Sequence, residues 1–101
     1  MALESKFQRE LKEQLFEMFP GCYIFKQDEH QLQGIPDLLI LWRNKWAMLE
    51  VKRSYADFMN PGPNQPYYVD EFNRMSFAAF IYPENREEVL RALQQAFGSR
   101  R

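Results

Sequence analysis

The sequence predicts an α/β fold in which a mixed central sheet is flanked by helices, and three observations carry this prediction. The chain has 101 residues, which suits one domain spanning residues 1–101. Hydrophobic residues make up 46% of the chain and charged residues 27%, a balance typical of globular proteins. Apolar stripes at helical spacing alternate with apolar runs of strand length. Their order along the chain is α-β-β-β-α-β-α.

The first half of the chain predicts one helix and three strands. A helix is expected over residues 2–19, because apolar residues recur there at spacings of three and four, at Leu3, Phe7, Leu11, Leu15 and Met18. A short strand is expected over residues 22–25. The continuous apolar run at residues 37–42 predicts a buried strand. A turn at residues 43–45 then leads into a return strand at residues 46–52, which completes a hairpin.

The second half of the chain predicts a loop, a helix, a strand and a final helix. The segment Asn60-Pro61-Gly62-Pro63-Asn64 cannot form a helix or a central strand. Pro66 suits the first turn of a helix, and Gly98 suits a helix C-terminal cap. The predicted elements are a loop at 53–65, a helix at 66–75, a strand at 77–82 and a helix from 84 or 85 to 97.

Charge and cysteine content exclude several classes of protein. Thirteen Lys and Arg residues face fourteen Asp and Glu residues, so a strongly basic, histone-like binder is excluded, although a local basic patch is not. The single cysteine, Cys22, excludes an internal disulfide framework and a multi-cysteine zinc site. No apolar run approaches the roughly 20 residues that a membrane-spanning helix needs. We therefore expect a cytoplasmic protein without a membrane partner or a nucleotide cofactor.

Two acids and a lysine are predicted to meet at one end of the hairpin. Antiparallel pairing brings Asp37, at the start of the first strand, beside Glu50 and Lys52, at the end of the second. Glu50 and Lys52 share a face because strand side chains alternate. Carboxylates that lie close together repel each other, and a divalent cation such as Mg²⁺ resolves that conflict. The lysine can hold a phosphate oxygen or stabilise charge in a transition state.

Glu4 is a further candidate for this site. At 100° per residue, it is the only acid of the first predicted helix that lies on the side of the apolar stripe. The other acids, Glu10, Glu13 and Glu17, lie on the solvent side. Glu4 is therefore either an unpaired carboxylate that destabilises the fold or part of the metal site.

The segment Gly34-Ile35-Pro36-Asp37, followed after twelve residues by Glu50-Val51-Lys52, resembles the motif of the PD-(D/E)XK nuclease superfamily. Glu4 matches the helix-one glutamate of that superfamily. The chain is especially similar to phage endonuclease I Holliday-junction resolvases. Gln65, at the start of a predicted helix, resembles a glutamine of the stand-alone VRR-Nuc branch. The resemblance implies a restriction-endonuclease-like core and, for a phage protein, a place in the host cytoplasm.

The resemblance also implies residue roles and a reaction. The reaction is Mg²⁺-dependent hydrolysis of phosphodiester bonds in DNA, with Mn²⁺ able to substitute, on branched substrates such as a Holliday junction or a flap. A junction needs two symmetric cuts, so a homodimer is expected. The resemblance implies that Asp37, Glu50 and the Val51 carbonyl bind the metal ion, and that Glu4 binds a second metal ion or its water. It implies that Lys52 orients the attacking water or stabilises the phosphate. It also implies that Gln65 positions Lys52 or a phosphate.

Other residues are candidates for contact with DNA, and plainer interpretations stay open. The candidate DNA-binding residues are Arg43, Lys45, Arg53, His30 and Tyr67. Asp37 could instead be a turn residue at a strand start, and Glu50 and Lys52 could form a solvated strand face. His30 could be an ordinary surface residue, and Gln65 a plain loop residue. The alternative function is a non-catalytic module that binds DNA or a protein on a degenerate nuclease fold.

Overall fold

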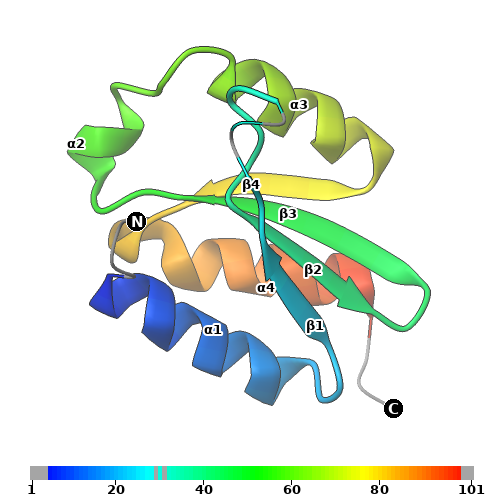
Figure 1. Ribbon diagram of the computed structural model, residues 1–101. Helices are drawn as coiled ribbons and strands as arrows, with labels where there is room; N and C mark the ends of the chain where they lie inside the picture. Colours follow the sequence, from blue (N-terminus) through cyan, green and yellow to red (C-terminus); the bar gives the residue numbers. More distant parts are fainter. Residues whose placement is uncertain (1–4, 29, 31, 99–101) are drawn as a thin grey trace.

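One four-stranded sheet forms the centre of the molecule in the computed structural model, which describes residues 5–28, 30 and 32–98 (Figure 1). Its spatial order is β1-β2-β3-β4, and the strands are β1 (Tyr23–Lys26), β2 (Leu38–Trp42), β3 (Lys45–Val51) and β4 (Phe77–Ile81). β1, β2 and β3 pair antiparallel, and β4 pairs parallel with β3. The predicted α/β fold with a mixed sheet is confirmed.

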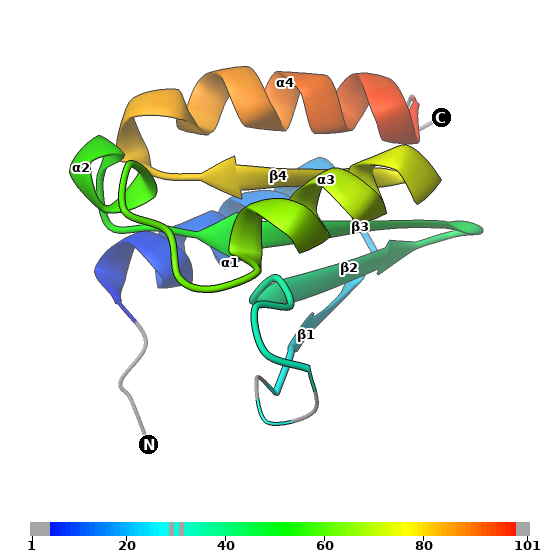
Figure 2. The ribbon, with the colours of Figure 1, turned by 90° about the horizontal axis from the view of Figure 1, so that it is seen from above.

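Helices cover both faces of this sheet, but they cover them unequally. α1 and α4 lie side by side on one face, and α3 lies on the other (Figure 1). α3 packs against β3 and β4 and leaves β1 and β2 uncovered, as the view from above shows (Figure 2). The helical elements are α1 (Lys6–Met18), α2 (Tyr55–Phe58), α3 (Gln65–Met75), the 3₁₀ turn η1 (Pro83–Asn85) and α4 (Arg86–Phe97).

The hydrophobic core lies between the sheet and the α1–α4 layer. Strand alternation sends every second residue of β2 into it, and α1 and α4 contribute their apolar stripes. An aromatic cluster closes the core near the β2–β3 turn, where the Trp42 ring lies 5.0 Å from the Phe19 ring and 6.1 Å from the Phe97 ring, between centroids. The Trp42 indole N–H donates a hydrogen bond of 2.9 Å to the Pro20 carbonyl. The buried core residues include Leu11, Leu15, Leu38, Ile40, Leu49, Ile81, Leu90 and Leu93.

Element boundaries differ from the sequence predictions where side chains cap the backbone. α1 begins at Lys6 instead of residue 2, because the Ser5 hydroxyl accepts a hydrogen bond from the Gln8 N–H at 3.0 Å and caps the helix. The predicted loop at 53–65 contains the single helical turn α2, which Ser54 caps in the same way. The expectations for residues 2–4, including the inward orientation of Glu4, lie outside the described residues.

Within the described part of the chain, no helix is long and apolar enough to cross a membrane. This agrees with the absence of a long apolar run in the sequence.

Candidate active site

The β2–β3 hairpin brings Asp37 next to the end of β3. Leu38 pairs with Leu49, so the next pair in the same register is Asp37 with Glu50. The Asp37 Oδ2 oxygen accepts a hydrogen bond of 3.0 Å from the Val51 N–H. The antiparallel hairpin predicted from the sequence is therefore confirmed, and it sets both carboxylates at one end of two adjacent strands.

Glu50 belongs to a buried polar network on the α3 face of the sheet. Only 2% of Glu50 is exposed. The Gln65 Nε2 group donates a hydrogen bond of 3.1 Å to the Glu50 Oε2 oxygen, and the Lys52 ammonium donates one of 2.7 Å to the Gln65 Oε1 oxygen. The Lys52 nitrogen also lies 3.9 Å from Glu50 Oε2. One buried amide thus links a carboxylate to an ammonium group.

Two glycines allow the loops around this network to approach each other. The Gly62 N–H donates a hydrogen bond of 2.8 Å to the same Gln65 Oε1 oxygen, which fixes the amide orientation. Gly34 has a φ of +92°, and a Cβ atom on it would lie 2.6 Å from the Pro63 carbonyl oxygen. The loop before β2 and the loop before α3 are therefore in direct contact. This contact holds the Asp37 segment against the start of the helix that carries Gln65.

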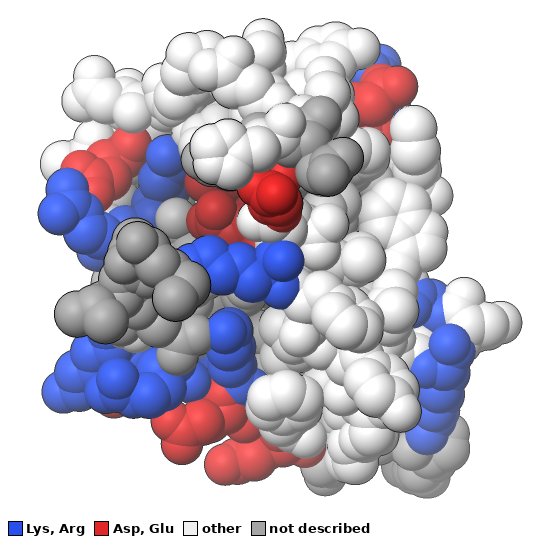
Figure 3. Space-filling model, viewed as in Figure 1, with Lys and Arg blue, Asp and Glu red and all other residues white. Residues whose placement is uncertain are grey.

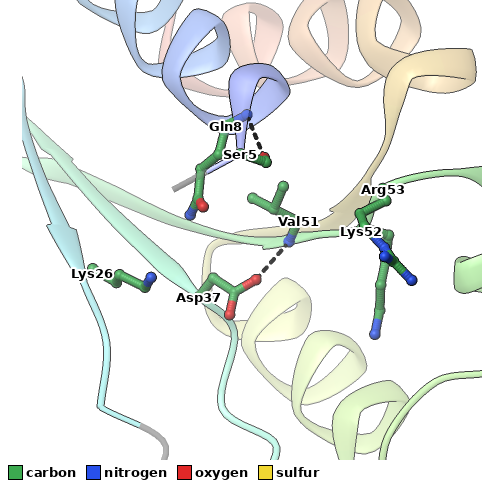
Figure 4. Close-up of a pocket in the computed structure, with 7 residues that line it drawn as sticks. All are labelled: Ser5, Gln8, Lys26, Asp37, Val51, Lys52 and Arg53. Atoms are coloured by element: carbon green, nitrogen blue, oxygen red, sulfur yellow. Dashed lines mark hydrogen bonds between the residues drawn. The ribbon is translucent and has the colours of Figure 1, made fainter. Parts of the chain in front are cut away.

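An open pocket of about 240 Å³ lies at this end of the sheet, next to Asp37. In Figure 4 the Asp37 carboxylate lies at the Val51 N–H, the Gln8 side chain extends from α1 toward the same space, and the Lys26 ammonium points toward Asp37. Acidic side chains flanked by Lys and Arg side chains are visible on the surface here (Figure 3). The pocket is lined by Ser5, Gln8, Lys26, Asp37, Val51, Lys52 and Arg53.

The other candidate residues lie in different parts of the molecule. Arg43 and Lys45 lie at the turn, which is the opposite end of the hairpin from Asp37. Tyr67 is exposed on α3, and His30 is exposed in the β1–β2 loop, where its N–H donates a hydrogen bond to the Asp28 side chain. Arg53 lines the pocket, and its hydrogen bond to the Asp57 carboxylate at 2.7 Å raises the pKa of its guanidinium. Glu4 lies outside the described residues.

Three residues of the pocket, Ser5, Gln8 and Lys26, are not among the sequence candidates. Gln8 is almost fully buried on α1, three and seven residues before Leu11 and Leu15. That spacing places a polar residue on the apolar stripe, and it was a signal available in the sequence. Lys26 ends β1, and no local pattern distinguishes it from a surface lysine, because its position depends on how β1 pairs with β2.

The donor atoms at this end of the sheet fit a hard divalent cation. Asp37 and Glu50 supply carboxylate oxygens, and the Val51 carbonyl points to the same side of its strand as the N–H that binds Asp37. Among the described residues, no group of three or more His, Cys, Asp or Glu side chains could hold a metal ion. Mg²⁺ keeps several waters and takes one or two carboxylates from a protein, so this small oxygen set suits Mg²⁺ better than Zn²⁺.

No protein-family model matches the chain, and no curated protein and no solved structure is significantly similar to it. The site consists of an open pocket lined by Asp37 and Lys52, and of the buried Glu50 and Gln65 to which Lys52 is linked. Carboxylate oxygens can bind a divalent cation, and an ammonium group can bind a phosphate.

Proposed function

We propose that the chain is a metal-dependent endodeoxyribonuclease of the PD-(D/E)XK type, which hydrolyses phosphodiester bonds in DNA. The observation that carries the proposal is the buried network of Glu50, Gln65 and Lys52 beside the anchored Asp37 carboxylate. Burying an ion pair contributes little net stability, and well-packed apolar residues would serve the fold as well or better. A chemical role accounts for this network better than a structural one.

The carboxylates of Asp37 and Glu50, together with the Val51 carbonyl, would hold the Mg²⁺ ion. When bound, the ion supplies positive charge that makes water more acidic and offsets negative charge on the phosphate oxygens. The hydrogen bond from the Val51 N–H occupies one Asp37 oxygen and fixes the direction of the carboxylate. This orientation is set before any substrate arrives, which is what an efficient ligand requires.

Lys52 stabilises the negative charge that develops on the phosphate during hydrolysis. Its side chain is only 14% exposed, so its charge acts in surroundings less polar than water. An ammonium group in such surroundings is effective at stabilising developing oxyanion charge. Gln65 acts as a positioning residue, because its single amide holds both the Lys52 ammonium and the Glu50 carboxylate.

The remaining cations of the pocket, Lys26 and Arg53, bind the phosphates next to the cleaved bond. Such contacts release counterions from DNA, so affinity falls as salt rises. We further propose that the substrate is branched DNA and that the working unit is a homodimer. Two symmetric cuts in a junction require two active sites, and a two-fold axis supplies them.

The test is an assay of cleavage on duplex, single-stranded, flap and four-way DNA with Mg²⁺ or Mn²⁺. We expect the wild type to cut at least one substrate only when metal is present, and Glu50→Gln to cut about a thousandfold more slowly. The matched control is Glu13→Gln, which changes an exposed glutamate of α1 and should leave the rate unchanged. DNA binding without cleavage in either metal would contradict the proposal and favour the non-catalytic module. Light scattering at micromolar concentration tests the dimer, and an active monomer would contradict that part.

A further inference from the structure

Two large rings are exposed on β1 and lie parallel to each other. Tyr23 is 66% exposed and Phe25 is 49% exposed. Their ring centroids are 6.4 Å apart, and the rings are inclined by only 10°. Across the strand pair, Tyr23 faces Leu41 and Phe25 faces Leu39. We call these four residues the aromatic face.

The aromatic face is uncovered because α3 packs on β3 and β4 only (Figure 2). The solvent side of an antiparallel strand pair is usually polar, so a continuous apolar surface there indicates a binding surface. Figure 3 shows a broad area without charged side chains over β1 and β2, directly beside the Lys, Arg, Asp and Glu side chains of the pocket end.

The aromatic face ends next to the candidate active site at the end of β1. Lys26 follows Phe25 in the chain, ends β1 and lines the pocket together with Asp37. Its ammonium points toward Asp37 (Figure 4). Successive strand side chains point to opposite faces, so Lys26 leaves the face opposite to Phe25. A ligand that lay on the two rings would therefore pass around the end of the edge strand β1 to reach the Lys26 ammonium and the pocket.

We propose that unpaired bases of the substrate stack on Tyr23 and Phe25 while the adjoining phosphates contact Lys26 and enter the pocket. Flat, exposed rings on a sheet surface with a neighbouring cation suit single-stranded nucleic acid, because every base has a π-face and every linkage a negative charge. This inference rests on the proposed function and narrows its substrate to DNA with a single-stranded segment, such as a flap or an overhang.

The test measures binding without cleavage, by fluorescence anisotropy in EDTA, on a short single-stranded oligonucleotide and a blunt duplex. Tyr23→Leu and Phe25→Leu retain apolar surface and remove the π-face. We expect each to weaken single-strand binding about tenfold and duplex binding less than about twofold. Phe16→Leu is the matched control, because Phe16 is an equally exposed ring, at 48%, on α1, and we expect it to bind as the wild type does.

Two results would overturn the inference. One is a Tyr23→Leu/Phe25→Leu double variant that binds single strands as tightly as the wild type. The other is a wild-type dimer that dissociates in Tyr23→Lys/Phe25→Lys, since a second copy of the chain would then occupy the face. The proposed function itself fails if the wild type shows no metal-dependent cleavage, which is a separate measurement. The EDTA measurement still decides whether bases stack on the aromatic face.

Discussion

The two ends of the β2–β3 hairpin bury opposite kinds of side chain. At the turn, Arg43 and Lys45 are exposed while the Trp42 ring is buried against Phe19 and Phe97. At the other end, Glu50 and Gln65 are buried, and the mostly buried Lys52 ammonium is hydrogen-bonded to Gln65. Both ends carry charged residues, but only one end keeps them away from water.

This difference indicates where the chemistry lies. An exposed cation contributes little to stability, because water screens its charge. A buried carboxylate linked through an amide to an ammonium group has a fixed orientation, and its charge is little screened. The turn end therefore stabilises the fold, and the other end, with Asp37, Glu50 and Lys52, is the candidate catalytic end.

The largest expected effect is on catalysis, from removal of one lysine at each end. Lys52→Ala should reduce metal-dependent cleavage about a thousandfold, because charge on the phosphate is then no longer stabilised. Lys45→Ala removes an exposed lysine at the turn and should change the rate less than about twofold. Single-turnover kinetics on the best substrate measures both. Equal losses in the two variants would show that the lysines act only through overall DNA affinity.

The next effect is on stability and concerns the turn end. Trp42→Ala removes a ring that is 2% exposed and should lower the free energy of unfolding by about 3–5 kcal/mol. Chemical denaturation monitored by circular dichroism gives the value. Glu50→Gln at the other end should change stability by less than about 1.5 kcal/mol, because the neutral amide keeps the size of the buried side chain. A larger loss of unfolding free energy in Glu50→Gln than in Trp42→Ala would show that the end with Glu50, and not the turn end, stabilises the fold.

Alanine variants of two glycines distinguish the effect of the loop contact from the effect of backbone strain. Gly34 and Gly21 have φ values of +92° and +87°, but a Cβ atom would meet Pro63 and Asn64 only at Gly34. Both alanine variants should lose about 1 kcal/mol of stability through the positive φ, and Gly34→Ala should lose more because its Cβ atom clashes with the backbone of the neighbouring loop. Gly34→Ala should in addition slow cleavage about tenfold or more, because the loop that positions Gln65 must move. Cleavage by Gly34→Ala at the wild-type rate would show that this contact does not position the network.

Much of the fold could be predicted from the sequence, and the site only in part. The hairpin that joins Asp37 to Glu50 follows from two apolar runs and a polar turn, which are local signals. α2 was missed because its single turn depends on the Ser54 cap, within a segment rich in Pro and Gly. Arg43 and Lys45 are DNA-binding candidates by their charge alone, and the predicted turn at residues 43–45 already places them at the end of the hairpin away from Asp37. Gln8 and Lys26 reach the pocket through tertiary packing.

The smallest expected effect concerns Cys22, which follows Pro20-Gly21 near the turn end. Burial raises the pKa of this thiol above its ordinary value of 9.0. The folded protein therefore keeps the thiol proton at a pH where the unfolded chain has lost it, and stability falls as pH rises above about 9. A thiol reagent at pH 8 should react at least about tenfold more slowly with the native protein than with the protein in denaturant. Equal rates would show that the thiol is accessible.

The most direct test of the central claim is an anomalous-diffraction measurement on crystals of the protein soaked in Mn²⁺. The account predicts one strong peak at the catalytic end of the hairpin, with oxygens of Asp37, Glu50 and the Val51 carbonyl about 2 Å from it. Ordered Mn²⁺ bound only elsewhere, or Asp37 and Glu50 too far apart to share one ion, would contradict it.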